Sequence, residues 1–188
     1  ETVEKAIRGG ANIVQLREKD TPKNELISLG RKLLNVTKRR GVPLIINDRA
    51  EIAKEIEAEG VHLGQYDMSV QEARKILGDG AIVGVSCYNS IDRGIKALKE
   101  GADYLAFGTP FFTPTKPDRK PTHLDVLKEV TRVFSNIPVF AIGGITIENA
   151  PLVLETGVDG IVVITSVFGS EDPELVSREF SSLFKNKN

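Results

Sequence analysis

Amphipathic helical patterns alternate with short apolar runs along the chain, and glycine with a small residue stands at most of the joints. The apolar runs are continuous rather than alternating with polar residues, which is typical of strands buried on both faces of a parallel sheet. Glycine just past a helix can adopt the left-handed conformation that turns the chain into the next strand. The pattern predicts seven strands, near residues 12–18, 43–47, 61–64, 81–86, 103–108, 138–142 and 160–165.

Helical patterns fill the gaps between these strands, and one precedes the first strand. The eight predicted helices span residues 1–9, 23–40, 50–59, 69–77, 90–100, 122–134, 147–156 and 172–184. Because a (β/α)8 barrel pairs each helix with a strand, we interpret residues 1–188 as a single TIM-barrel domain that lacks its first strand, which we expect to have preceded Glu1. An open doubly wound sheet is the competing fold. Its phosphate fingerprint would be a glycine-rich turn after the first strand, where this sequence reads QLREKD.

Composition and charge narrow the class of protein. The chain has 188 residues, of which 40% are hydrophobic, so it can bury one sizeable core. Its 25 basic and 26 acidic residues give a net charge of −1, so we expect neither nucleic acid nor a membrane as a partner. The one cysteine, Cys87, excludes an internal disulfide and fits a reducing compartment, which predicts a cytoplasmic protein. The apolar stretches are also far shorter than the ~20 residues of a membrane helix.

Polar and charged residues follow the predicted strands, and in a barrel the carboxyl ends of the strands surround one pocket. The first strand ends in QLREK at residues 15–19. Because side chains alternate along a strand, Gln15, Arg17 and Lys19 share one side and bring two cations and an amide together. A solvated strand end explains this cluster equally well when it is taken alone.

Two acids follow the next two strands. Asp48 comes directly after PLIIN, and Asp67 comes three residues after VHLG. Carboxylate oxygens suit Mg²⁺, which usually takes one or two of them together with waters and the phosphates of a substrate. Each acid taken alone is more simply a helix cap, Asp48 for the next helix and Asp67 ahead of Ser69. Only the coincidence of the two favours a magnesium site.

The string TPTKP at residues 113–117 places two hydroxyls and a lysine between prolines. Such a stiff loop can direct Thr113, Thr115 and Lys116 at an anion with little loss of conformational entropy. A plain proline-rich surface loop is the alternative interpretation.

The last two predicted strands end in GGIT at residues 143–146 and ITS at 164–166. Barrels often bind phosphate at these strand ends through backbone amides, although glycines also serve a tight turn before a helix. Ser86, at the end of the fourth strand, offers a further donor for a phosphate. The neighbouring Cys87 has no histidine beside it, and we interpret it as a small buried apolar group.

The two histidines, His62 and His123, have no carboxylate or nucleophile at a recognisable motif spacing. We therefore predict structural roles for both.

Taken in order, these strings resemble the thiamine phosphate synthase family. They are QLREK, ND, VHLGQ followed by Asp67, GVS, ADY with FG, TPTKP, AIGGIT and GVDGIVVITSVFGSEDP. The match covers essentially the whole chain, and the combination is specific although each string alone is weak. The resemblance implies a (β/α)8 barrel and an Mg²⁺-dependent transferase. Such an enzyme joins hydroxymethylpyrimidine diphosphate to a thiazole phosphate and releases pyrophosphate and thiamine phosphate.

The resemblance also implies a role for each site residue. Asp48 and Asp67 match the Mg²⁺ ligands, and Gln15 matches the contact to the pyrimidine. The diphosphate contacts are Arg17, Lys19, Asn47, Ser86 and Lys116, and all of these except Asn47 are candidate catalytic residues. Contacts to the thiazole and its phosphate are Thr113, Thr115, Gly144 and the backbone of Ile164 and Thr165. The implied partners are the two small-molecule substrates and, in a homo-oligomer, a second copy of the chain.

Some positions depart from the family pattern. Phe112 stands where proline is common and His123 where glycine is common, while Cys87 and Tyr88 stand where a small residue and histidine are frequent. A related thiazole tautomerase is one alternative, but it tends to lose the acid after VHLG and the TPTK threonines, and it would use a histidine near Ser86. A phosphate-ligand binding barrel without turnover is the other alternative.

Overall fold

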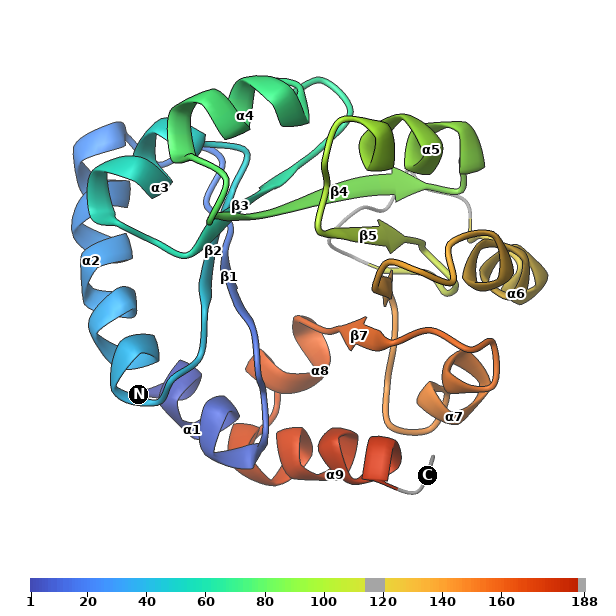
Figure 1. Ribbon diagram of the computed structural model, residues 1–188. Coiled ribbons are helices and arrows are strands. Elements are labelled where there is room, and N and C mark those ends of the chain that lie inside the picture. The colour runs from blue at the N-terminus through green and yellow to red at the C-terminus, as the bar shows by residue number, and fades with distance from the viewer. Residues whose placement is uncertain (114–120, 186–188) are drawn as a thin grey trace.

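A computed structural model describes residues 1–113 and 121–185, and its fold resembles a TIM barrel as predicted. Seven parallel strands form one sheet in chain order. Figure 1 shows this sheet curling, with most of the helices on its outside. The strands are β1 (Val14–Leu16), β2 (Leu44–Asn47), β3 (Gly60–Leu63), β4 (Ile82–Tyr88), β5 (Tyr104–Phe107), β6 (Val139–Ile142) and β7 (Gly160–Val162).

All eight predicted helices are present, and the described residues contain one more. The helices are α1 (Thr2–Gly9), α2 (Lys23–Arg39), α3 (Ala50–Ile56), α4 (Val70–Leu77), α5 (Ile91–Lys99), α6 (Leu124–Val133), α7 (Ala150–Leu154), α8 (Thr165–Phe168) and α9 (Pro173–Lys185). The short helix α8 was not predicted, because the apolar run IVVIT resembles a longer strand. The strand β7 stops at Val162, since its partner β6 ends at Ile142 and the chain turns away at Gly143, where φ is 111°.

The ring of helices is completed by contact between the first and last helices, α1 and α9. A Cβ atom on Gly9 would lie 2.6 Å from Ser177 Cβ, so the two helix backbones approach closely only because residue 9 is glycine. Arg8 Nε donates a hydrogen bond to Glu174 at 2.8 Å across the same contact. Within residues 1–113 and 121–185, however, no strand joins β7 to β1. Among these described residues the barrel has seven paired strands, and its first and last strands are not paired with each other.

The alternation of side chains along the strands separates an apolar face from a polar one. Ile46, Val61 and Val83 are paired in register and fully buried among the core residues beneath the helices. The residue that follows Ile46 on β2 and the residue that follows Val61 on β3 point to the opposite face. There, Asn47 pairs in register with His62, and His62 pairs with Gly84. Polar groups thus line the face of the sheet that turns away from most of the helices.

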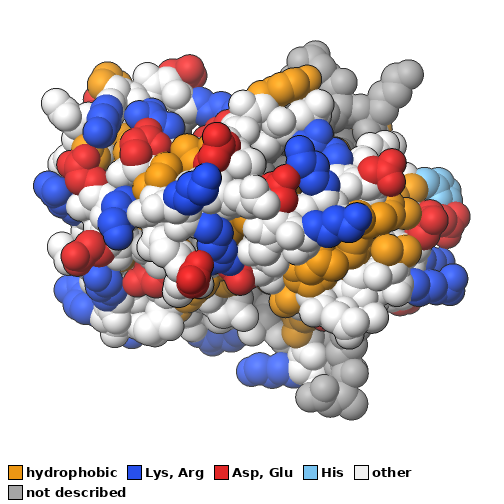
Figure 2. All heavy atoms as spheres, turned by 45° about the horizontal axis from the view of Figure 1, so that its top comes forward, with side chains coloured by type: hydrophobic (Ala, Val, Ile, Leu, Met, Phe, Trp, Pro, Cys, Tyr) orange, Lys and Arg blue, Asp and Glu red, His pale blue; other side chains and the backbone are white. Residues whose placement is uncertain are grey.

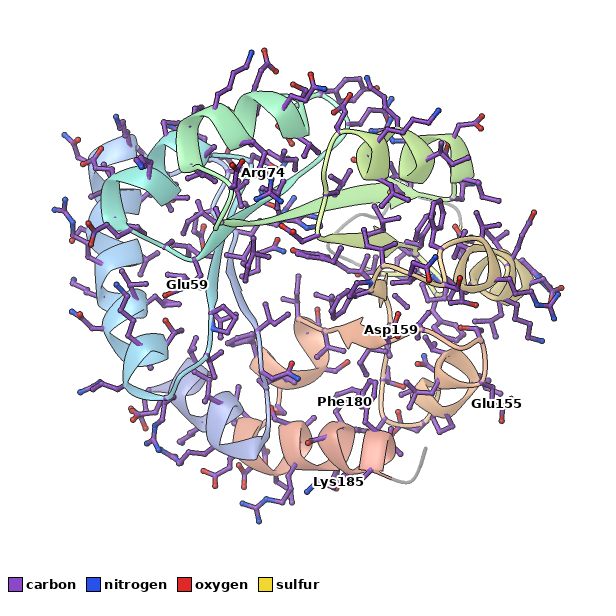
Figure 3. The ribbon with its side chains drawn as sticks, viewed as in Figure 1. Glu59, Arg74, Glu155, Asp159, Phe180 and Lys185 are labelled. Atoms are coloured by element: carbon purple, nitrogen blue, oxygen red, sulfur yellow. The ribbon has the colours of Figure 1, made fainter. Side chains whose placement is uncertain are left out.

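Carboxylates at the amino ends of three strands tie neighbouring strands together. Glu59, Asp103 and Asp159 each accept a backbone N–H from the start of an adjacent strand, at 2.7–2.8 Å. Figure 3 labels Glu59 and Asp159, which directly precede β3 and β7. Arg74 on α4 adds an ion pair to Asp103 at 2.6 Å. These acids have structural partners, and they lie at the opposite end of the strands from the predicted site.

The surface carries no dominant charge on the face that Figure 2 shows, where acidic and basic side chains intermingle. This distribution agrees with the net charge of −1. None of the helices in the described parts of the chain combines the length and the apolar character that a bilayer span requires.

Candidate active site at the carboxyl ends of the strands

The structure brings the first two predicted strand ends together. Gln15 lies within β1, Arg17 follows it directly, and Asn47 is the last residue of β2. Lys19 Nζ lies 3.5 Å from Asp48 Oδ2, so the loop after β1 reaches the residue after β2. Because the strands are parallel and paired in chain order, their carboxyl ends form one edge. The predicted cations and the first predicted acid therefore share that edge.

Asp48 occupies a backbone conformation that few residues adopt. Its φ is 64°, in the left-handed region, where aspartate is found more often than most residues. Its N–H donates to the carbonyl of His62 at 2.8 Å, which fixes it against β3. The N-cap residue of α3 is Arg49, and no side chain caps that helix. The alternative that Asp48 is the helix cap is therefore wrong.

Asp67 is likewise not the cap of the following helix. Ser69 caps α4 through a reciprocal capping box with Glu72. Asp67 Oδ2 instead accepts a hydrogen bond from Gly64 N at 2.6 Å, which folds the loop after β3 back on itself. This loop holds the Asp67 carboxylate beside the end of β3.

The Asp67 carboxylate acts on the neighbouring carboxyl group of Asp48. Burial raises the pKa of Asp48, and hydrogen bonding to and repulsion by Asp67 raise it further, while Lys19 opposes both effects. Two adjacent acids of this kind are the hard oxygen donors that suit a divalent cation such as Mg²⁺. In the described part of the chain, no group of three or more acidic, histidine or cysteine side chains is placed to hold a metal. A cation bound at this pair would take its other ligands from water and substrate.

Ser86 lies near the end of β4 in a hydrogen-bonded chain that the sequence did not reveal. Its Oγ lies 2.8 Å from His62 Nε2, and His62 Nδ1 lies 2.9 Å from the hydroxyl of Tyr104. His62 and Tyr104 are buried, and their rings stack with centroids 5.6 Å apart. The predicted structural role of His62 thus includes direct contact with a candidate substrate-binding residue. The available signal was that His62 and Ser86 both point to the polar face of the sheet.

Of the two residues after Ser86, Cys87 is buried and Tyr88 is partly exposed. Cys87 is fully buried, and burial raises the pKa of its thiol to about 12, which agrees with its interpretation as a small core group. Tyr88 has a φ of 60°, and its ring lies 5.2 Å from the guanidinium carbon of Arg93. The Tyr88 hydroxyl accepts a hydrogen bond from Gln65 N at 3.4 Å. Tyr88 therefore contacts the loop that carries Asp67.

The predicted thiazole side is only partly described. Thr113 is buried, while Thr115 and Lys116 lie outside the described residues. Of the departures from the family pattern, Phe112 is exposed. His123 is the N-cap of α6, where its Nδ1 accepts from Asp125 N at 3.4 Å, which fits the predicted structural role.

The turn after β6 requires glycine. Gly144 has a φ of 66°, and a Cβ atom there would lie 2.7 Å from the carbonyl oxygen of Phe111. Asn149 Nδ2 donates to the Gly144 carbonyl at 3.0 Å and holds the turn in place.

This turn is tied to the start of α8. Ser166 Oγ donates to the carbonyl of Ile145 at 2.6 Å, so the turn after β6 and the first turn of α8 are linked. Ile164 is the N-cap of α8 and Thr165 its first residue, and both are exposed. The structure thus connects the two segments that were predicted to contact a phosphate.

Known proteins of one family are similar to this chain. The chain matches the family described as thiamine monophosphate synthase over residues 1–167. It is 48% identical to the thiamine-phosphate synthase of Clostridium novyi, over 97% of this chain and 89% of the relative. It is 46% identical to that of Methylococcus capsulatus, over 96% and 80% of the two chains.

Solved structures give the same answer. The thiamine phosphate pyrophosphorylase of Pyrococcus furiosus superposes with a TM-score of 0.90 at 37% identity, covering 98% of this chain and 88% of the other. The 3-hexulose-6-phosphate synthase of Salmonella typhimurium has a TM-score of 0.75 at 16% identity, a likeness of fold alone. The family match, the relatives and the fold agree, and the chain belongs to the thiamine monophosphate synthase family, whose members are transferases of thiamine biosynthesis.

Proposed function

We propose that this chain condenses hydroxymethylpyrimidine diphosphate with a thiazole phosphate to give thiamine phosphate and pyrophosphate in the presence of Mg²⁺. Membership of the family supports the reaction. The observation that carries the assignment of the site is the approach of Lys19 to Asp48, beside the neighbouring carboxylate of Asp67. A cation and two acids at one sheet edge suit a substrate that brings a diphosphate and a metal together.

The reaction breaks the bond between the pyrimidine methylene carbon and the diphosphate oxygen, and the electron pair leaves with pyrophosphate. The thiazole nitrogen then supplies the electron pair of the new carbon–nitrogen bond. Negative charge grows on the departing group, so fixed cations and hydrogen-bond donors around it stabilise the transition state. Mg²⁺ held by Asp48 and Asp67 would neutralise part of that charge. The attacking nitrogen has no proton to lose, so no general base is assigned.

We assign the remaining residues by position. Gln15, which lies in β1 two residues before Arg17, would orient the pyrimidine ring. The residues proposed to bind the diphosphate are Arg17, Lys19, Asn47, Ser86 and Lys116.

The thiazole and its phosphate would lie across the site from the diphosphate, at the ends of the later strands. Thr113 and Thr115 would contact the thiazole. Gly144 and the backbone at Ile164 and Thr165 would contact its phosphate, since the first N–H groups of a helix have no partners within the helix. The linked turn and helix start support this assignment.

We also propose that residues 1–188 form one domain and that the protein works in the cytoplasm. The absence of a second cysteine supports a reducing compartment, and the shared edge of the seven strands supports one domain. A homo-oligomer would add a second copy of the chain as a partner.

A product assay tests the function. The purified protein is supplied with both precursors, with and without Mg²⁺, and thiamine phosphate and pyrophosphate are detected by mass. Asp48→Asn is compared with Asp79→Asn, an exposed acid in the loop before β4 at the other end of the strands. We expect Mg²⁺-dependent product from the wild type and the control, and at least about 100-fold less from Asp48→Asn.

The two alternatives give different results in the same assay. Conversion of the thiazole between tautomers without condensation would identify a tautomerase. Binding of both ligands without any reaction would identify a silent barrel.

A further inference from the structure

Two hydrogen bonds connect Tyr104 to His62 and His62 to Ser86, and their donors and acceptors can be assigned. We propose that Tyr104 and His62 are positioning residues that hold the Ser86 hydroxyl as a donor toward the substrate diphosphate: the Tyr104 hydroxyl donates to His62 Nδ1, and His62 Nε2–H donates to Ser86 Oγ. The proposal rests on the proposed function, since it names a substrate group that Ser86 faces. No proton is transferred in this arrangement.

The geometry that allows the chain comes from the register of three strands. His62 pairs with Gly84, and Gly84 pairs with Tyr104, so the glycine lies between the two rings on the same level of the sheet. A Cβ atom at position 84 would overlap the Tyr104 ring. Because residue 84 has no side chain, the ring of Tyr104 lies across β4 and its hydroxyl reaches His62 on β3.

The direction follows from the number of donors and acceptors. A neutral imidazole has one N–H and one acceptor nitrogen, whereas a tyrosine hydroxyl has one proton to donate. Tyr104 is buried, and within residues 1–113 and 121–185 its hydroxyl makes one hydrogen bond, to His62 Nδ1. If Nδ1 carried the proton, the buried Tyr104 hydroxyl would have no acceptor for its own, which is costly. The favoured tautomer therefore carries its proton on Nε2.

Tyr104 also keeps its proton. Burial raises the pKa of Tyr104 well above its usual range, so the hydroxyl keeps its proton near neutral pH. Its ring packs edge-on against Phe140 at 5.2 Å as well as on His62, which restricts its orientation. The donor at the start of the chain is thus fixed in both protonation and position.

The direction decides what Ser86 can do. When His62 Nε2–H donates to Ser86 Oγ, the serine proton is available for another acceptor. With the other tautomer, the serine hydroxyl would donate its proton to His62 Nε2 and could only accept a hydrogen bond from a ligand. The oxygens of a diphosphate are acceptors, so only the first arrangement suits the proposed substrate. Removing a residue that orients a metal ligand typically costs about 10- to 100-fold in activity, and we expect a loss of the same order for residues that orient Ser86.

The first test measures the tautomer directly and needs no turnover. The full chain is labelled with ¹⁵N-histidine, and the ring nitrogens of its two histidines are distinguished with a His123→Gln variant. We expect His62 Nδ1 to give the signal of an unprotonated nitrogen and Nε2 that of a protonated one. Protonation of Nδ1 with a bare Nε2 would overturn the proposal.

The second test asks whether His62 acts through Ser86. We expect His62→Leu to lower kcat by about 10- to 100-fold with a smaller change in KM, and His62→Gln, whose amide can replace the Nε2–H donor, to recover most of kcat. In a Ser86→Ala background, His62→Leu should lower kcat by less than about 2-fold. An equal loss in both backgrounds would show that His62 acts independently of Ser86 and would contradict the proposal.

If His62→Leu fails to fold, Tyr104→Phe can be compared in the wild-type and Ser86→Ala backgrounds instead, because it removes only one oxygen. We expect it to populate the Nδ1–H tautomer and to lower kcat several-fold, but only while Ser86 is present; an unchanged tautomer would overturn the proposal. These results are separable from the proposed function. If the wild type makes no thiamine phosphate while His62 carries its proton on Nε2, the function fails and the direction of the hydrogen bonds stands.

Discussion

Lys19 Nζ lies 3.5 Å from Asp48 Oδ2, and this ion pair joins the loop after β1 to the end of β2. The Lys19 side chain is 55% exposed, so the attraction adds little to the stability of the fold. The pair therefore matters more for the candidate site, where it partly offsets the repulsion between Asp48 and Asp67.

Lys19→Met tests the cationic part of this site. We expect kcat/KM for the pyrimidine diphosphate to fall by about 10- to 100-fold, because one cation facing the leaving group is lost. Lys23→Met is a closely matched control: Lys23 is 52% exposed, and its Nζ lies 3.5 Å from Glu55. Steady-state kinetics of both variants with saturating Mg²⁺ make the comparison. Equal losses in the two variants would show that Lys19 has no special role.

The raised pKa of Asp48 predicts how stability depends on pH without Mg²⁺. Since the pKa in the folded state lies above its ordinary value of 3.8, the folded protein holds the proton more tightly than the unfolded one. This contribution to stability is fully present below about pH 3.8 and is lost as pH rises through the folded-state pKa.

Asp48→Asn removes the charge at this position and hence the loss of stability that its ionisation causes as pH rises. We expect its Tm, relative to that of the wild type, to rise between about pH 3.8 and neutrality, by no more than a few degrees since the site is partly exposed. Thermal unfolding in a chelator across this range measures the difference. A difference that stays constant or falls with rising pH would contradict the assigned cause.

The sequence predicted the order of helices and strands because continuous apolar runs and helix-ending glycines mark them locally. It predicted their lengths less well. The first strand was expected over residues 12–18, yet only Val14–Leu16 pairs with β2. Strand length depends on the neighbouring strand, as it does for β7, and a short helix such as α8 follows where pairing stops.

In the candidate site, too, local features were predicted from the sequence and features that depend on neighbouring strands were not. Lys19 and Asp48 each follow a predicted strand, so their proximity follows from parallel pairing alone. The contact of His62 with Ser86 depends on the register of β3, β4 and β5 and on the missing side chain at Gly84. A register is a relation between distant segments, and the local patterns from which the strands were predicted do not show which residues pair. The roles assigned to the site residues stay predictions until variants are measured.

Cys87 is expected to be unreactive in the folded protein. It is fully buried, and burial raises the pKa of its thiol to about 12, so little thiolate forms near neutral pH. We expect a thiol reagent at about pH 8 to label the native protein at least about 100-fold more slowly than the protein in denaturant. Because the chain has one cysteine, any label reports on Cys87. Rapid labelling of the native state would show that β4 opens or that the thiol is accessible.

Gly84→Ala tests the packing that holds Tyr104 over β4. The added Cβ would overlap the Tyr104 ring, so we expect a loss of about 1–3 kcal/mol in the free energy of unfolding. Gly80→Ala is the control, because no heavy atom lies within 4 Å of a Cβ at that position, and we expect a change of no more than about 0.5 kcal/mol. Denaturant unfolding measures both.

The cause of that loss can be isolated with a second substitution. Tyr104→Leu removes the ring that the new Cβ would overlap, so the double variant Gly84→Ala/Tyr104→Leu should be more stable than the sum of the two single changes predicts. Gly84→Ala should also break the hydrogen bond between Tyr104 and His62, because a displaced Tyr104 ring can no longer place its hydroxyl 2.9 Å from His62 Nδ1. Strict additivity would mean that the alanine is accommodated by movement of β4 rather than of Tyr104, and the glycine would then serve the strand instead of the ring.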